Sequence, residues 1–254
     1  MNGFDRVILE FLNRPAFHSP SLDLLAIKIS TNLLLKGGVV LAAIWWLWFA
    51  RPRNRFALGS LDVDSSIART RRLIIMGFAG TFVALALARG SSVMFSSRPR
   101  PLNQSNVFQI PEGVDTGSKS FFINDSSFPS DHAALFYALA TTILFVSRPV
   151  GVAMFMYVTL IIMVPRLYLL LHFPTDILAG GILGTACVIL LSTIGSVTVV
   201  GRSLVQRAFG WSVTHQATFY AAMFLWSFSI AELFDSLRKL ANLGPILRML
   251  ASHH

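Results

Sequence analysis

Long apolar runs separated by short polar stretches dominate the chain. A hydrocarbon layer about 30 Å thick takes roughly 20 helical residues to cross. Runs of this kind predict about six transmembrane helices, at 30–50, 73–95, 132–148, 150–168, 175–200 and 212–232. The turn SRPVG between the third and fourth is tight, which predicts that these two helices form an antiparallel hairpin.

The first 20 residues follow a different pattern, with apolar residues at helical spacing opposite charged ones. The apolar set is Phe4, Val7, Ile8, Phe11 and Leu12, and the charged set is Asp5, Arg6, Glu10 and Arg14. This predicts an amphipathic helix lying in the membrane interface, with a solvent-facing end cap as the alternative. The predicted fold is an all-α polytopic membrane bundle with an N-terminal interfacial helix.

Three units follow from this pattern. Residues 1–20 form the interfacial segment, residues 21–205 the transmembrane core, and residues 206–254 an extra transmembrane helix with a basic tail.

Composition agrees with a membrane location. The 254 residues are 54% hydrophobic and 13% charged, with a mean hydropathy of +0.63, too apolar for a single soluble domain. Asp5 and Glu10 interrupt the N-terminal segment, which argues against a cleavable signal peptide. Cys187 is the sole cysteine, so an intramolecular disulfide is excluded.

The formal net charge of +9 is informative once it is mapped onto loops. Arginines gather in the predicted loop 51–72, and the positive-inside rule puts this loop in the cytoplasm. Segments 96–131 and 169–175 then fall outside. Six crossings put both termini outside, whereas the basic tail favours the cytoplasm, so the side of the C-terminus stays open. Because these arginines have a membrane explanation, a nucleic-acid partner is set aside.

Three polar islands stand at the predicted outer ends of apolar helices. They read RPRP at 98–101, FPSDH at 128–132 and PRLYLLLHFPTD at 165–176. Ionisable groups at membrane depth are costly unless they face one another or a wet cavity, so the three islands predict one shared site.

The residue types of these islands suit phosphoryl transfer. Arginines at 98 or 100 and at 166 supply planar charged forks for phosphate oxygens, and Ser130 can cap a helix whose first N–H groups point at an anion.

A pair of histidines, His132 and His172, can divide the roles of nucleophile and proton donor. Asp176 can hold the remaining ring N–H of His172. We expect no metal or other cofactor, because the arginines already supply positive charge.

Taken singly, each island has an ordinary explanation. RPRP can be a membrane-flanking turn, PSDH a capped helix start and His172 an interfacial side chain. Arg166 could reach water by snorkelling. These explanations do not account for the occurrence of all three islands together in this order.

In this order the motifs resemble the three-part signature of the type 2 phosphatidic acid phosphatase superfamily, over roughly residues 20–200. The second motif of this superfamily usually reads Pro-Ser-Gly-His, and here Asp131 replaces the Gly. An aspartate at this position is similar to the motif of some bacterial prenyl-diphosphate phosphatases. In the third motif Pro165 replaces the usual Ser. The Lys that usually stands seven residues before the first Arg-Pro is absent, since Val93 or Ser91 occupies that position. Arg89 is a candidate substitute.

The resemblance implies a role for each matching residue. His172 would form a phosphohistidine, Asp176 would orient it, and His132 would protonate the leaving group. The implied substrate-binding set is Arg98, Arg100, Ser130, Asp131 and Arg166.

On this basis the expected activity is metal-independent hydrolysis of a lipid phosphate or diphosphate, with undecaprenyl diphosphate as the leading substrate. The alternatives are phosphatidate, phosphatidylglycerophosphate or lipid A phosphatase activity, or a non-catalytic lipid-phosphate binder or transporter. The expected location is a bacterial inner membrane, with the site on its outer face. The expected partners are the membrane and the lipid substrate, and the oligomeric state is left open.

Overall fold

Every regular element that the structure describes is helical, which confirms the predicted all-α membrane bundle. This computed structural model describes residues 1–16, 18–50, 60–94, 98–103 and 126–232. Its elements in chain order are α1 (Gly3–Asn13), α2 (Pro20–Thr31), a π-helical turn (Leu34–Gly38), α3 (Val39–Phe49), α4 (Ser60–Met94), a short 3-10 turn (Pro101–Asn103), α6 (Asp131–Val146), α7 (Arg148–Tyr157), a second π-helical turn (Val158–Met163), α8 (Val164–Tyr168), α9 (Pro174–Val197), α10 (Val199–Thr214) and α11 (Gln216–Ala231).

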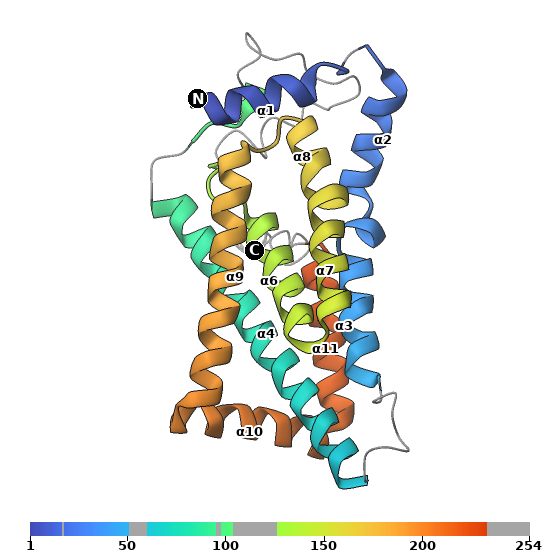
Figure 1. Cartoon of the computed structure of the whole chain (residues 1–254), viewed down its shortest axis with the longest axis vertical. Helices are drawn as coiled ribbons and strands as arrows, with labels where there is room; N and C mark the ends of the chain where they lie inside the picture. Colours follow the sequence, from blue (N-terminus) through green and yellow to red (C-terminus); the bar gives the residue numbers. More distant parts are fainter. Residues whose placement is uncertain (17, 51–59, 95–97, 104–125, 233–254) are drawn as a thin grey trace, which may run out of the picture.

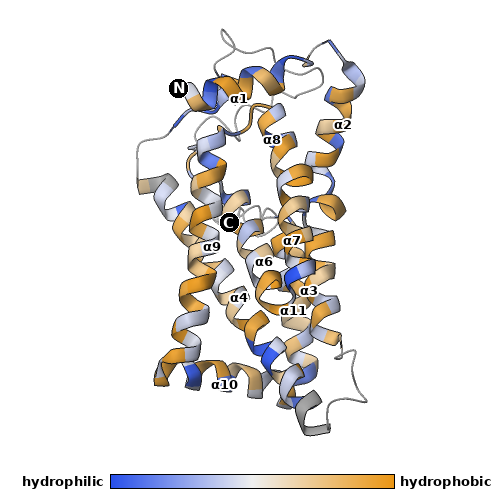
Figure 2. Cartoon of the chain, viewed as in Figure 1, coloured by the Kyte–Doolittle hydropathy of each residue, from blue (hydrophilic) through white to orange (hydrophobic). Residues whose placement is uncertain are grey.

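Most helices run along the long axis of the molecule, while α1 lies across one end and α10 across the other (Figure 1). Orange, apolar residues cover the lengthwise helices, and blue, polar residues are prominent near both ends (Figure 2). By length and composition, three described helical segments could cross a membrane: 64–91, 148–168 and 174–197. A fourth is possible if the pair Pro20–Thr31 and Leu34–Phe49, bent by 59°, counts as one span. At 16 residues each, α6 and α11 are shorter than a full crossing.

Two boundaries differ from the sequence-based expectation. The helix expected at 73–95 begins at Ser60, so the arginines at 69, 71 and 72 lie on α4 rather than in a loop. The expected loop after residue 200 is instead α10, whose N-cap Thr198 accepts a hydrogen bond from the Gly201 backbone N–H at 3.0 Å. The proposed division into units at 20 and 205 stays a prediction, and the basic tail at 233–254 lies outside the described residues.

The N-terminal helix turns its apolar face away from the protein. In α1 the buried residues are Asp5, Leu9 and Asn13, which are spaced one helical turn apart. By contrast, Phe4, Val7 and Phe11 are each more than half exposed. An apolar face pointing outward at the end of a membrane bundle is typical of an interfacial helix, because the headgroup boundary can cover that face.

Helices α4, α6 and α9 form the centre of the bundle, and glycines permit their closest approaches. A Cβ on Gly180 would lie 2.3 Å from the carbonyl oxygen of Ser130, and one on Gly184 would lie 2.1 Å from that of Ala134. These glycines are one turn apart on α9, so the α9 backbone lies directly against the first turns of α6. Small residues allow such close approach in membrane helices, where dispersion contacts replace the hydrophobic drive.

We expect Gly184→Ala to destabilise the bundle by about 1–3 kcal/mol, because the added methyl group meets the backbone of α6 rather than a flexible side chain. Thermal or denaturant unfolding of the detergent-solubilised protein measures the change. Gly210→Ala in α10 is the matched control, since nothing lies within 4 Å of a Cβ built there. Equal stability of the two variants would contradict a backbone-to-backbone contact between α6 and α9.

Candidate active site

The third polar island folds into a tight connection between α8 and α9. Leu170 takes a positive φ of 57°, which reverses the chain, and Pro174 opens α9 where its missing N–H has no intrahelical use. Asp176 lies in the first turn of α9, and its Oδ2 accepts a hydrogen bond from the Phe173 backbone N–H at 2.8 Å. The island therefore presents His172 just ahead of a capped helix start.

His172 is nearly fully buried, with 4% of its surface exposed. Its Nδ1 lies 3.0 Å from the backbone carbonyl oxygen of Ser127 and 3.9 Å from Oδ2 of Asp176. A carbonyl oxygen can only accept, so Nδ1 carries the proton in this contact and the neutral ring keeps its lone pair on Nε2. The backbone carbonyl of Ser127 thus sets the tautomer, whereas the predicted carboxylate of Asp176 lies beyond hydrogen-bond distance of Nδ1.

Burial lowers the pKa of His172 below its usual value, and the nearby Arg100 guanidinium lowers it further, whereas Asp176 opposes the shift. The imidazole therefore stays neutral at neutral pH. A neutral imidazole is the form that can act as a nucleophile.

Asp176 is fully buried and is held by Arg98. The Arg98 Nη1 lies 2.6 Å from Asp176 Oδ1, and its Nη2 lies 2.7 Å from Oδ2 of Asp5. The same guanidinium stands over the Phe173 ring, 4.0 Å from its centroid. Arg98 thus bridges two buried carboxylates, which offset its charge.

The second carboxylate comes from the interfacial helix α1. Asp5 has no exposed surface. It accepts hydrogen bonds from the Thr175 backbone N–H at 2.9 Å and from the Thr175 hydroxyl at 2.8 Å. Sequence reasoning missed Asp5 and Thr175, because Asp5 belongs to the charged face of α1 and charged faces usually meet water.

The second island begins α6 as predicted. Ser130 caps the helix by accepting from the Ala133 N–H at 3.4 Å, and its own N–H donates to the Asp176 carbonyl at 3.1 Å. The starts of α6 and α9 are therefore joined directly.

Asp131 makes close contacts with both of its side-chain oxygens. Oδ1 accepts from the His132 backbone N–H at 2.8 Å and lies 3.1 Å from His132 Nδ1, while Oδ2 lies 2.5 Å from Nη2 of Arg89. Arg89, the candidate for the absent Lys, thus reaches the site by neutralising Asp131.

Two further predicted arginines surround the histidine pair. Arg166 is 3% exposed and donates to the Ile162 carbonyl at 2.8 Å, and Arg100 donates to the Leu171 carbonyl at 3.0 Å. Arg100 interacts electrostatically with His172, and Arg166 with His132. The structure therefore gathers every residue of the predicted site, although Arg98 contacts carboxylates. Residues 104–125 of the predicted polar segment lie outside the described residues.

Asp131, His132 and His172 each offer a ligand atom within 4.8 Å of the others, a grouping that could hold a metal ion. Their existing contacts compete with that use, since Asp131 already faces Arg89 and His132.

Comparison with known proteins supports the resemblance at the level of the superfamily. Residues 73–198 match the family described as the PAP2 superfamily. No curated protein matches the chain, and no solved structure matches it.

Members of this superfamily are phosphatases, which supports a phosphoric ester hydrolase, and the long apolar helices indicate an integral membrane protein. The matched segment holds all three polar islands, from Arg98 to Asp176, whereas Asp5 of α1 lies outside it.

Proposed function

We propose that this protein hydrolyses a lipid phosphate or diphosphate through a phosphohistidine on His172, without a metal ion. The observation that carries the proposal is the Ser127 carbonyl on His172 Nδ1 at 3.0 Å, which leaves Nε2 unprotonated, together with a second histidine within 4.8 Å. A non-catalytic lipid-phosphate binder needs neither feature.

In the proposed reaction, Nε2 of His172 attacks phosphorus while the bond from phosphorus to the leaving oxygen breaks. His132 gives its proton to that oxygen. Water then attacks the phosphohistidine, His132 takes a proton from the water, and inorganic phosphate leaves with the His172 ring restored. Microscopic reversibility makes His132 the acid of one step and the base of the next.

The remaining residues would stabilise the charges that develop on the phosphoryl oxygens and on the two histidines during this reaction. Arg100 and Arg166 would bind the phosphoryl oxygens, with the N–H groups that begin at Ser130. Asp131, paired with Arg89, would hold the His132 ring through Nδ1. Arg98 and Asp5 would hold Asp176, which stabilises positive charge on His172.

The leading substrate is undecaprenyl diphosphate at the outer face of a bacterial plasma membrane. The Asp131 variant of the second motif supports this substrate by resemblance, and the positive-inside rule supports this face. Phosphatidate, phosphatidylglycerophosphate and lipid A are the alternative substrates.

Phosphate release from undecaprenyl diphosphate, phosphatidate and phosphatidylglycerophosphate, with purified protein and excess chelator, tests the activity. We expect turnover of undecaprenyl diphosphate, and at least about a 1,000-fold loss of kcat in His172→Ala. His215→Ala is the matched control, because that exposed histidine begins α11 outside the site. Absence of release from every lipid would refute the phosphatase proposal, and loss of release on adding chelator would refute its metal independence.

The pH profile of kcat/KM tests the state of His172. Attack needs the neutral ring, so activity should fall on the acid side only as His172 becomes protonated. Because Arg100 lowers the pKa of His172, Arg100→Gln should move the acid limb to higher pH. Arg100→Lys keeps the charge and should leave the limb in place. If the acid limb of the kcat/KM profile stays at the same pH in Arg100→Gln, a group other than His172 controls that limb.

Asp5→Asn tests the link from α1. Removing the charge that faces Arg98 should let Arg98 and Asp176 shift, which lowers kcat about tenfold or more with little change in KM. Glu10→Gln is the control, since Glu10 lies on the same helix in an exposed pair with Arg6. Equal kcat in the two variants would remove Asp5 from the mechanism.

A further inference from the structure

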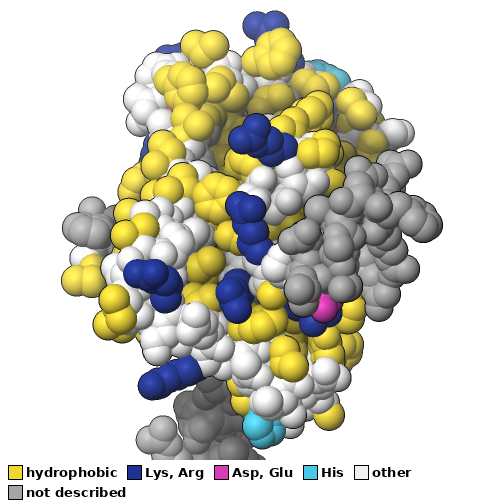
Figure 3. All heavy atoms as spheres, turned by 60° about the horizontal axis from the view of Figure 1, so that its bottom comes forward, with side chains coloured by type: hydrophobic (Ala, Val, Ile, Leu, Met, Phe, Trp, Pro, Cys, Tyr) yellow, Lys and Arg dark blue, Asp and Glu magenta, His cyan; other side chains and the backbone are white. Residues whose placement is uncertain are grey.

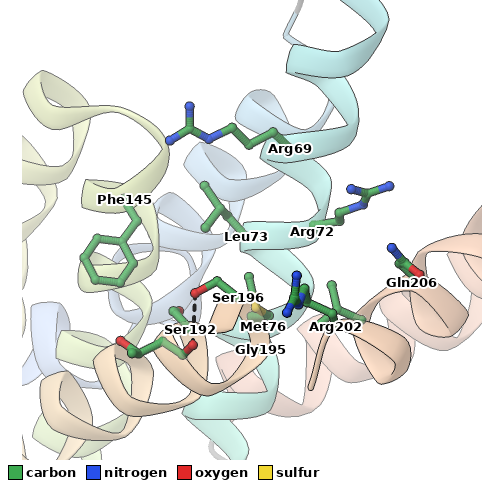
Figure 4. A pocket seen from close by; sticks show the side chains of 12 residues that line it. Arg69, Arg72, Leu73, Met76, Phe145, Ser192, Gly195, Ser196, Arg202 and Gln206 are labelled. Carbon is green, nitrogen blue, oxygen red and sulfur yellow. Dashed lines mark hydrogen bonds between the residues drawn. The ribbon is translucent and has the colours of Figure 1, made fainter. Parts of the chain in front are cut away.

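A cavity lies at the end of the bundle opposite the candidate active site, where α10 crosses beneath α4 and α9 (Figure 1). Its volume is about 510 Å³, and its walls come from α4, α6, α9 and α10. Figure 4 shows the side chains that line it. None of the catalytic residues proposed above lines this cavity.

Positive charge surrounds the cavity. Arg69 and Arg72 extend from α4, and Arg202 extends from α10 below them in this view (Figure 4). The lining that the structure describes contains no aspartate or glutamate. Figure 3, which looks toward this end, shows Lys and Arg side chains scattered among apolar ones. Three guanidinium groups around one cavity form a site for an anion.

Fixed contacts hold two of these arginines near the cavity. The Arg202 Nη2 donates to the Val197 carbonyl at 3.2 Å, and the Arg72 guanidinium stands over the Phe209 ring, 5.0 Å from its centroid. Both partners are neutral, and among the described residues no carboxylate forms an ion pair with either guanidinium. Arg72 also keeps a buried Nε without a hydrogen-bond partner among the described residues.

Ser192 gives an independent sign of a missing ligand. This lining residue is 92% buried, at 8% exposure, and its Oγ has no hydrogen-bond partner among the described residues. A buried hydroxyl without a partner is costly, so such groups usually indicate an absent water, ion or ligand. The hydroxyl lies in the same cavity as the three guanidinium groups.

Apolar side chains form part of the remaining wall. Leu73, Met76 and Phe145 line the cavity, and Phe145 is 41% exposed. On the adjoining α10, Val199, Val200 and Leu204 are all more than half exposed. A bound molecule would therefore meet cations at one end and hydrocarbon at the other, which fits an amphiphile better than a free ion.

We propose that this cavity, which we call the α4–α10 pocket, binds the phosphate headgroup of an anionic phospholipid, with an acyl chain lying along α10. By the positive-inside rule this end faces the cytoplasm, where basic pockets between transmembrane helices meet anionic headgroups. The bound lipid tethers α10 to α4. This inference does not depend on the proposed phosphatase activity, because it concerns binding at the other end of the bundle.

Native mass spectrometry of the full chain in neutral detergent tests the proposal. Phosphatidylglycerol is titrated against phosphatidylcholine, and inorganic phosphate is added as a competitor. We expect one phosphatidylglycerol to bind about tenfold or more tighter than phosphatidylcholine. Each arginine near an anionic headgroup is worth about fivefold in affinity, so the triple variant Arg69→Gln/Arg72→Gln/Arg202→Gln should lose roughly 100-fold.

Two further variants localise the binding. Arg207→Gln is the matched control, because this exposed arginine of α10 does not line the pocket. Ser192→Ala removes the buried hydroxyl without altering the charge of the pocket. It should weaken the binding of phosphatidylglycerol severalfold, and the variant should elute from size-exclusion chromatography as the wild type does. Equal binding by wild type and the triple variant would overturn the proposal. So would displacement of the lipid by inorganic phosphate at comparable affinity, since that identifies a free-anion site.

Discussion

The candidate active site depends on one buried chain of charges, in which Arg98 stands between Asp5 and Asp176. An isolated carboxylate or guanidinium in an apolar bundle is costly, and each member of this chain lowers that cost for the next. The chain joins three segments far apart in sequence: the interfacial helix, the first polar island and the start of α9. The other contacts of the site follow from their alignment. Through its backbone, Arg98 also accepts a hydrogen bond from the Ser127 N–H at 2.9 Å, and the carbonyl of Ser127 faces His172.

This arrangement gives the two arginines of RPRP different surroundings. Arg98 faces the carboxylates of α1 and α9, whereas Arg100 interacts electrostatically with the histidine and with Arg166. Asp131, the departure in the second motif, meets Arg89, and Arg89 is the cation nearest to the missing Lys along α4. Two departures from the usual pattern are therefore in contact with each other. Because Asp131 is paired with the Arg89 cation, the two residues together add no net charge near Arg100 and Arg166.

Much of the site could be predicted from sequence because membrane burial makes polar residues conspicuous. His172, Asp176 and Arg166 stand out in apolar runs, and their cost in lipid implies mutual contact. Most of the helices were predictable for the same reason. The exceptions are α2, which was not expected, and α10, whose charged residues resemble those of a loop. Asp5 was not predictable, since a charged residue on an amphipathic helix normally faces water. The contact of Ser127 with His172 also leaves no trace in the sequence, because any residue type can supply a backbone carbonyl.

The glycine contact between α6 and α9 has a mechanical consequence. At Gly180 and Gly184 no side chain separates the two helices, so their spacing is fixed by main-chain atoms that have no alternative rotamers. His132 is in the first turn of α6 and His172 lies two residues before α9, and the hydrogen bond from the Ser130 N–H to the Asp176 carbonyl joins the starts of the two helices. The two imidazoles therefore belong to one stiff unit. Tilting or repacking of the surrounding helices in bilayers of different thickness would leave the separation of the two histidines unchanged.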